Sequence, residues 1–108
     1  MQVETFVKPV PQNRKLSRGR GSRLFLNKEY VQCWDAIKTE FSSQASEPLN
    51  GDVSVSIEFG WKRMDLDSCV KSILDVLQGI AYANDRQVTE LKIVRCKKEK
   101  IIVVIEKK

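Results

Sequence analysis

Residues 53–79 read VSVSIEFGWKRMDLDSCVKSILDVLQG, and this stretch decides the fold. Every second residue from Val53 to Phe59 is apolar, which is typical of a half-buried β-strand. After a charged connection, helical periodicity predicts a helix that begins near Asp65 and ends at Gly79, with the glycine as its C-terminal cap. Its buried stripe is expected to consist of Leu66, Val70, Ile73, Leu74 and Leu77. A strand followed by an amphipathic helix favours a domain in which helices cover a sheet.

The flanking sequence supplies further strands and another helix. Asn27 is a candidate cap for a helix that runs to about Ser42, with an apolar face of Tyr30, Trp34, Ile37 and Phe41. Strands are predicted at Val3–Val7, from Gln87 to about Cys96 and at Ile101–Ile105, with an extended stretch at Arg23–Leu26 and a charged turn at Lys97–Lys100. The predicted order is strand, loop, helix, strand, helix, strand, strand. We therefore expect an α+β fold, a single small domain over residues 1–108 with its helices packed on one sheet.

Composition narrows the classes of function and the compartment. The 108 residues contain no histidine, which excludes Ser-His and Cys-His nucleophile pairs and removes the commonest transition-metal ligand. Because Cys33, Cys69 and Cys96 are odd in number and far apart, we expect buried thiols rather than a disulfide framework or a zinc site. No apolar run is long enough to cross a bilayer, and the first residues lack the pattern of a secretory signal. We expect a cytoplasmic protein with no membrane partner.

Basic residues concentrate near the start of the chain. The formal net charge is +5, and no acid occurs between Lys8 and Lys28. Proline, glycine, serine and asparagine interrupt this stretch, which predicts a flexible loop at about residues 8–24 whose arginines suit phosphate oxygens. A solvated basic loop without a partner is the simpler alternative. The candidate DNA-binding residues, in this loop and beside the acids described next, are Lys8, Arg14, Lys15, Arg18, Arg20, Arg23, Lys62, Arg63 and Arg86.

Four carboxylates and one lysine stand out in this otherwise basic chain. Asp67, Lys71 and Asp75 follow at i+4 spacing, which places them on one side of the predicted helix, and Asp65 lies at or just before its first turn. Asp85 lies in the connection to the next strand, so we expect it near Asp65 and Asp67 at one end of the sheet. Clustered carboxylates repel one another, and a divalent cation relieves that repulsion while leaving sites for water and a phosphate oxygen. Without histidine, the ligands favour Mg²⁺, with Mn²⁺ as a substitute.

Each of these residues also has a simpler structural explanation. Either of the first two aspartates fits a helix cap that accepts backbone N–H groups. Lys71 fits a surface ladder of ion pairs with the acids four residues before and after it. Asp85, after Asn84, fits a turn in which both side chains bond their own backbone. Taken singly, none of them decides the function.

One spacing pattern joins these residues. The chain has Asp65-Leu66-Asp67, then Lys71, then Leu74-Asp75, and finally Asn84-Asp85-Arg86-Gln87-Val88. This pattern strongly resembles that of the RusA-type Holliday-junction resolvases, and residues 19–30 resemble that family's basic loop and first helix. The resemblance covers most of the chain. The sequence departs from the family at Ser68, where asparagine is usual, and at Asn84, where aspartate is frequent.

The resemblance implies a small homodimeric endonuclease that binds branched DNA and makes paired, symmetric cuts in four-way junctions with Mg²⁺ or Mn²⁺. By position, Asp65, Asp67 and Asp85 are implied to be catalytic acids that bind the metal, and Lys71 is implied to be the essential lysine. Asp75 is given a supporting role. The resemblance also makes a phage or prophage source an expectation.

Two other functions fit the same sequence. One is a non-catalytic nucleic-acid-binding module whose acids are caps and ion pairs, and the other is a metal-dependent nuclease for flaps, forks or other branched DNA. Trp61 fits either a base-stacking position or the core, and its place at the end of a buried strand favours the core. For the dimer, the apolar strand Ile101–Ile105 is a candidate interface.

Overall fold

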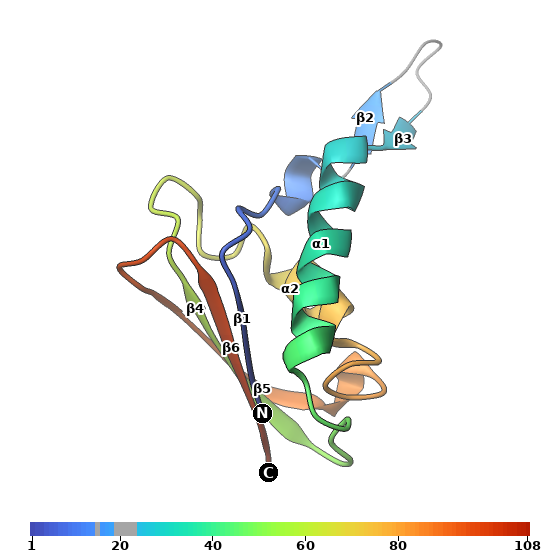
Figure 1. Cartoon of the computed structure of the whole chain (residues 1–108), viewed down its shortest axis with the longest axis vertical. Coiled ribbons are helices and arrows are strands. Elements are labelled where there is room, and N and C mark those ends of the chain that lie inside the picture. Colours follow the sequence, from blue (N-terminus) through green and yellow to red (C-terminus); the bar gives the residue numbers. More distant parts are fainter. Residues whose placement is uncertain (15, 19–23) are drawn as a thin grey trace.

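The computed structural model describes residues 1–14, 16–18 and 24–108, and a four-stranded sheet organises them. The strand order is β1-β6-β4-β5, where β1 is Gln2–Thr5, β4 is Val53–Phe59, β5 is Val88–Arg95 and β6 is Ile101–Lys107. β6 pairs antiparallel with both β1 and β4, whereas β4 and β5 pair in parallel. The helices α1 (Lys28–Gln44) and α2 (Val70–Leu77) lie on one side of this sheet (Figure 1). The predicted α+β fold with helices packed on one sheet is confirmed.

The core lies between the sheet and the helices. Val53, Val55, Ile57 and Phe59 are buried on the helical side of β4, as the alternation predicted. The inward residues of β6 are also buried. Because β6 lies between β1 and β4, both of its edges are paired and its inward residues pack in the core. As a dimer interface, the strand Ile101–Ile105 offers its outward apolar side chains Ile102 and Val104, which are half-buried, and this role stays a prediction.

Helix α1 begins where the sequence predicted. The side chain of Asn27 caps it by accepting the backbone N–H of Tyr30 at 3.2 Å. The predicted apolar face of Tyr30, Trp34, Ile37 and Phe41 is buried in the core. The indole nitrogen of Trp34 donates to the carbonyl of Val10 at 3.0 Å, which ties the segment after β1 to the helix.

Helix α2 begins at Val70, so the prediction that it starts near Asp65 is wrong. The side chain and the backbone N–H of Ser68 both donate to the carbonyl of Asp65, at 2.7 and 3.1 Å, and close a turn ahead of the helix. A serine that bonds nearby backbone in this way competes with helix formation. Asp67 therefore lies outside the helix that carries Lys71 and Asp75.

The end of α2 follows the predicted pattern more closely. The helix ends at Leu77, and Gly79 adopts a left-handed φ of 90°, which glycine does at little cost. The backbone N–H of Gly79 donates to the carbonyl of Tyr82 at 2.7 Å. This bond reverses the chain and directs it toward the start of β5.

The basic segment is more regular than predicted. Residues Gln12–Arg14 form a 3₁₀ turn (η1), and strand β2 (Leu16–Arg18) pairs antiparallel with β3 (Leu24–Leu26). This small hairpin lies at the start of α1, away from the main sheet (Figure 1). Ladder hydrogen bonds satisfy backbone groups that a free loop would leave to water. The segment predicted as a flexible loop at 8–24 therefore contains regular structure in its described part, its flexibility stays a prediction, and residues 15 and 19–23 lie outside the described residues.

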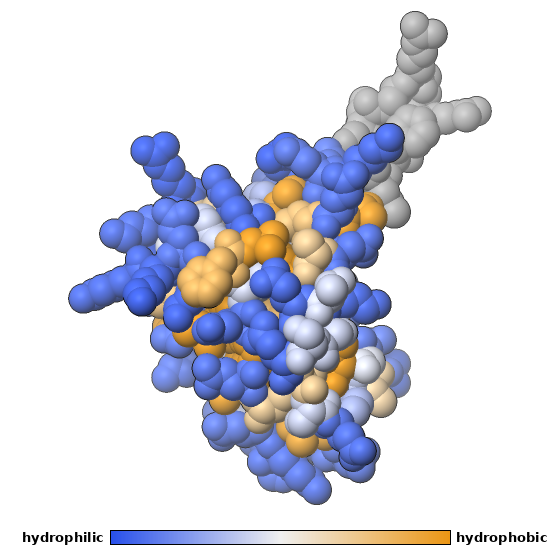
Figure 2. Space-filling model, in the orientation of Figure 1, coloured by the Kyte–Doolittle hydropathy of each residue, from blue (hydrophilic) through white to orange (hydrophobic). Residues whose placement is uncertain are grey.

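Burial also corrects the expectation of three buried thiols. Cys69 is fully buried, and burial raises its pKa to about 11, whereas Cys33 and Cys96 are only partly buried. Trp61 is 5% exposed, so its assignment to the core is confirmed. Hydrophilic residues cover much of the face seen in Figure 2, with smaller hydrophobic areas between them. None of the helices in the described part of the chain is long and apolar enough to span a membrane.

Candidate active site

Asp85 opens a short 3₁₀ turn, η3 (Asp85–Gln87), between α2 and β5. The side chain of Asn84 caps this turn by accepting the backbone N–H of Arg86 at 2.9 Å. The backbone N–H of Asp85 donates to the side-chain oxygen of Gln78 at 3.2 Å. The turn is thus made by neighbouring amide side chains, which leaves the carboxylate of Asp85 available for other partners.

Gln87 fixes this turn to the rest of the fold. Its side-chain oxygen accepts the backbone N–H groups of Ala83 and Asn84, at 2.9 and 3.1 Å. Its side-chain nitrogen donates to the carbonyls of Leu49 and Gly51, at 3.0 and 2.8 Å. One glutamine therefore joins the segment that bears Asp85 to the loop that enters β4.

Lys71 lies between two acids. Its ammonium donates to Asp75 at 2.8 Å and lies 3.6 Å from the carboxylate of Asp85. The three side chains are 59%, 45% and 37% exposed, so the cluster is open to solvent. The hydrogen bond and charge of Asp75, aided by Asp85, raise the pKa of Lys71 above its ordinary value. In this arrangement the two carboxylates favour the charged form of Lys71.

Asp65 and Asp67 lie in the turn that precedes α2. Both side chains are exposed, and within the described residues neither carboxylate has a hydrogen-bond or ion-pair partner. Cys69 occupies the N-cap position of the helix and makes no side-chain cap bond. The helix-cap explanation of these two aspartates is therefore not supported. The expected ion-pair ladder forms only in part among the described residues, since Lys71 pairs with Asp75 and not with Asp67.

Arg95 anchors the chain just before this turn. Its guanidinium donates to the carbonyl of Trp61 at 2.9 Å and to that of Met64 at 3.1 Å. Arg95 ends β5, whose carboxyl end lies beside that of β4 because the two strands are parallel. Two backbone carbonyls ahead of Asp65 are thus held by one side chain from the neighbouring strand.

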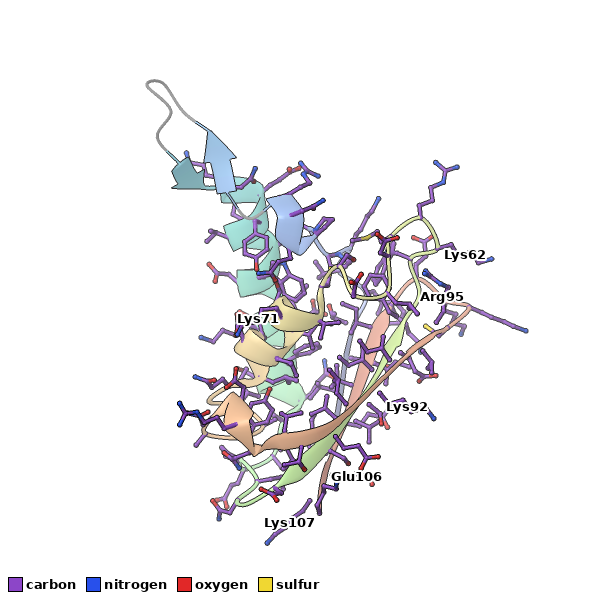
Figure 3. All side chains as sticks on the ribbon, turned by 180° about the vertical axis from the view of Figure 1, so that it is seen from behind. Lys62, Lys71, Lys92, Arg95, Glu106 and Lys107 are labelled. Carbon is purple, nitrogen blue, oxygen red and sulfur yellow. The ribbon has the colours of Figure 1, made fainter. Side chains whose placement is uncertain are left out.

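The two groups of acids lie at opposite ends of the sheet, which corrects the expectation that they share one end. Asp65 and Asp67 follow the carboxyl end of β4, whereas Asp85 precedes the amino end of β5. Between parallel strands the chain must cross back, and α2 makes that crossing. Figure 3 shows Lys62 and Arg95 at one end of the sheet and Lys71 on the helical side between the ends. Lys71 reaches Asp85 from the first turn of α2 because its side chain is long.

A comparison of the chain with protein families identifies its family. A family model described as endodeoxyribonuclease RusA matches residues 7–106. The chain belongs to the RusA endodeoxyribonuclease family. No curated protein sequence matches it. The match spans every acid considered above and Lys71, so the expected membership is confirmed.

The acids of this RusA family member fit a hard divalent cation by their chemistry. Carboxylate oxygens are the ligands that Mg²⁺ and Mn²⁺ prefer, and Asp65, Asp67 and Asp85 are all accessible. Their positions are less favourable, since no three acidic or cysteine side chains of the described residues gather closely enough to hold a metal ion. The structure brings together Lys71, Asp75 and Asp85, and keeps Asp65 and Asp67 apart from them.

The candidate DNA-binding residues fall into three places. Lys8, Lys62 and Arg63 line one cavity at the carboxyl end of β4. Arg14 pairs with Glu29 at 2.7 Å, and Arg86 is exposed beside Asp85. All nine stay predictions as DNA-binding residues, and for four of them the structure gives no side-chain position, since it describes neither the side chain of Arg18 nor any part of Lys15, Arg20 and Arg23.

Sequence reasoning missed the residues that hold this site in place. Gln87 stood inside the Asn84–Val88 pattern, four residues after the Ala83 whose N–H it binds, but no role was inferred for it. Gln78 carried no signal, because its bond to the N–H of Asp85 spans a turn that no local pattern marks. Arg95 carried none because its partners are backbone groups of the neighbouring strand's end. A polar amide three residues after a cap residue is a capping-box pattern, and this was the one available indication for Gln87.

Proposed function

We propose that this RusA family member is a metal-dependent endodeoxyribonuclease that resolves four-way DNA junctions by paired, symmetric cuts. The observation that carries the proposal is the family match over residues 7–106, a range that includes Asp65, Asp67, Lys71 and Asp85. The lysine held between acids, in a chain of net charge +5, gives the match a chemical basis. A nucleic-acid protein that presents bare carboxylates to phosphate needs a cation to offset the repulsion.

In this proposal Asp65, Asp67 and Asp85 hold Mg²⁺, for which Mn²⁺ substitutes. When bound, such an ion lowers the pKa of water and offsets charge on the phosphate during hydrolysis. The three acids do not form a ready site by themselves, so holding one ion together would require the turn at residues 65–69 to lie closer to Asp85. The absence of partners for Asp65 and Asp67 within the described residues is consistent with such a movement.

Lys71 supplies a positive charge to the scissile phosphate. Its raised pKa keeps it protonated, so its role is to bind a phosphate oxygen rather than to remove a proton. Asp75 orients the ammonium by accepting its hydrogen bond at 2.8 Å. This assigns the supporting role of Asp75 to the placement of Lys71, without a direct contact to DNA.

The protein acts as a homodimer in this proposal. Two cuts placed symmetrically across a junction require two active sites related by a two-fold axis, which a dimer supplies. Each protomer contributes one set of acids and one Lys71.

The test is cleavage of a labelled synthetic four-way junction, beside a linear duplex of matched sequence, with Mg²⁺ or with chelator. We expect ligatable nicks confined to the junction and lost with chelator. Asp67→Asn should lower the cleavage rate by more than about 100-fold, since even loss of residues that merely support metal ligands costs roughly 10–100-fold. The variant should bind the junction as well as the wild type or more tightly, because one repulsive charge is gone.

Three outcomes separate the alternatives. Cleavage that survives Asp67→Asn in a homogeneous preparation contradicts the site. Binding without cleavage under every metal leaves a nucleic-acid-binding module. Equal or faster cleavage of flaps or forks at matched salt assigns a different branched substrate, because affinities compared at one salt mostly report charge.

A further inference from the structure

We propose that a strand of the DNA substrate lies along a cationic track at the carboxyl end of β4. The track consists of Lys97, Lys62, Arg63, Lys8 and Arg14, and two neighbouring cavities form it. This inference rests on the proposed function and names the surface that binds the substrate beside the acids. It adds Lys97, from the turn between β5 and β6, to the DNA-binding residues.

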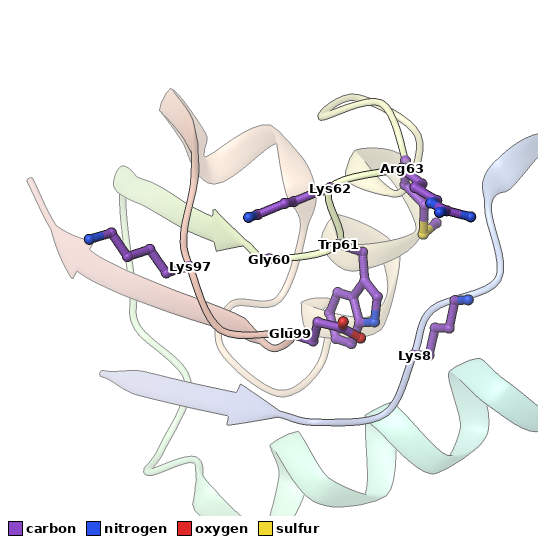
Figure 4. Close-up of a pocket in the computed structure, with 8 residues that line it drawn as sticks. Lys8, Gly60, Trp61, Lys62, Arg63, Lys97 and Glu99 are labelled. Carbon is purple, nitrogen blue, oxygen red and sulfur yellow. The ribbon is translucent and has the colours of Figure 1, made fainter.

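The first cavity is open and strongly basic. Its volume is about 370 Å³, and Lys8, Lys62, Arg63 and Lys97 line it together with Trp61 and Glu99. Figure 4 shows Lys8 and Arg63 on one side of Trp61 and Lys62 and Lys97 on the other, with the side chain of Lys97 directed outward, from three segments of the chain that are far apart in sequence. Within the described residues none of the four cations is in an ion pair. Four free cations against one carboxylate favour a polyanionic ligand.

The second cavity continues the first toward the basic N-terminal segment. It also measures about 370 Å³, shares Lys8 and Met64 with the first cavity, and includes Arg14 and Glu29. The Arg14 to Glu29 pair is exposed, with side chains 55% and 67% accessible. Exposed pairs of this kind are weak, so a phosphate can replace the carboxylate as the partner of Arg14.

The track runs beside the turn that carries Asp65 and Asp67. Residues 61–64 form the wall of the first cavity and run directly into Asp65 and Asp67. The backbone N–H of Gln12 donates to the carbonyl of Ser68 at 2.8 Å, so the segment from Lys8 to Arg14 passes beside the same turn. A strand held along the track therefore has phosphates next to the turn that carries two of the proposed metal ligands.

The ligand contact is to phosphate rather than to a base. Trp61 is only 5% exposed, so its ring is not available as a stacking platform. The lining groups are ammonium and guanidinium donors, which bind phosphate oxygens without regard to sequence. Arg95 holds the backbone of residues 61–64, which lines the first cavity, because its guanidinium donates to the carbonyls of Trp61 and Met64.

The experiment compares two lysines of the β5 to β6 region that differ in position but not in charge. Lys97→Ala removes a cation of the track, whereas Lys92→Ala removes an exposed cation on β5 outside it. Binding to a four-way junction is measured in chelator over a salt series, so that no cleavage occurs. We expect Lys97→Ala to raise the Kd roughly threefold to tenfold and to reduce the slope of log K against log salt by about 1, with Lys92→Ala close to the wild type. Lys97→Glu should weaken binding further.

Equal affinity of the Lys97→Ala and Lys92→Ala variants for the junction overturns the proposal that DNA lies along the track. That result leaves Mg²⁺-dependent cleavage by the wild type untouched, so the proposed function survives it. If the wild type neither binds nor cuts branched DNA, the proposed function and the track fail together. Because both lysines are exposed, thermal melting should be the same for both variants, and this confirms that neither change acts through folding.

Discussion

The two acid-bearing segments of this molecule are held in different ways. The segment of Asp85 is anchored by the amide side chains of Gln87 and Gln78, and its carboxylate already faces Lys71. The turn of Asp65 and Asp67 is anchored through backbone carbonyls, by Arg95 at Trp61 and Met64 and by Gln12 at Ser68, and its carboxylates have no partner among the described residues. Half of the proposed site is therefore held in place by side-chain bonds, while the carboxylates of the other half have no partner among the described residues.

Strand β5 connects both halves. Gln87 lies immediately before its first residue, and Arg95 is its last. The separation between the two anchored backbones is therefore set by the length of one strand. The following changes loosen one half at a time, in order of decreasing effect.

Gly60→Ala should destabilise the fold next to the turn that carries Asp65 and Asp67. A Cβ at Gly60 would lie 1.7 Å from the carbonyl oxygen of Lys98, so the turn after β5 must move away from residues 61–64. Overpacking of this kind costs about 3 kcal/mol. Urea denaturation measures the loss. Gly51→Ala is the matched control, because its φ of 76° disfavours alanine by about 1–2 kcal/mol but no atom lies within 4 Å of the added carbon. Equal stability of the Gly60→Ala variant and the wild type would contradict the close approach.

Gln87→Ala should loosen the half that carries Asp85. It removes four hydrogen bonds to backbone groups, and we expect a loss of about 2 kcal/mol of unfolding free energy. It should also raise the Mg²⁺ concentration needed for half-maximal cleavage, because Asp85 is no longer fixed.

Gln44→Ala is the control for this change. The side chain of Gln44 likewise bonds backbone, at the N–H and carbonyl of Glu4, but it lies at the far end of α1. It should cost about 1 kcal/mol without changing the dependence of cleavage on metal. A shift in metal dependence shared by both variants would assign the effect to general stability.

Tyr82→Phe tests how the stability of the protein near the segment of Asp85 depends on pH. The hydroxyl of Tyr82 donates to the carbonyl of Leu74 at 2.8 Å, and burial, with the charges of Asp85 and Asp75, raises its pKa. The folded state thus retains a proton that the unfolded chain loses near pH 10, so stability falls as pH rises above about 10. Lys71, whose pKa is also raised, adds a loss in the same direction.

The phenylalanine variant should lose about 1 kcal/mol at neutral pH and show a shallower decline of stability above pH 10. Denaturation curves between pH 7 and 11 measure both effects. Parallel curves for the variant and the wild type would show that Tyr82 does not titrate on unfolding.

Local patterns predicted the elements whose causes are local. The alternation of Val53–Phe59 and the Asn27 cap both depend on neighbours within a few residues, and both were placed correctly. The start of α2 was misplaced because Ser68 competes for the carbonyl of Asp65, and periodicity does not register that competition.

The position of the site depended on pairings that no local pattern contains. The parallel pairing of β4 with β5 separates Asp85 from Asp65 and Asp67, and it is fixed only when the whole sheet forms. The family resemblance identified the acids and Lys71 by spacing, yet it did not show that Lys71 would contact Asp75 and Asp85. Arg95 and Gln87 act on backbone groups more than 30 residues away, and such partners cannot be inferred from one sequence.

The sheet order has a consequence for how the protein is made. β1, the first strand in the chain, pairs only with β6, the last, within the described residues. During synthesis β1 and the helix packed on it must wait for almost the whole domain before they gain a neighbouring strand. Contacts between segments so far apart are formed late, because the entropy of closing the long intervening loop must be overcome first. Folding on the ribosome is therefore expected to complete only after β6 emerges, and a chain stalled before that point exposes the apolar edge of β4 to aggregation.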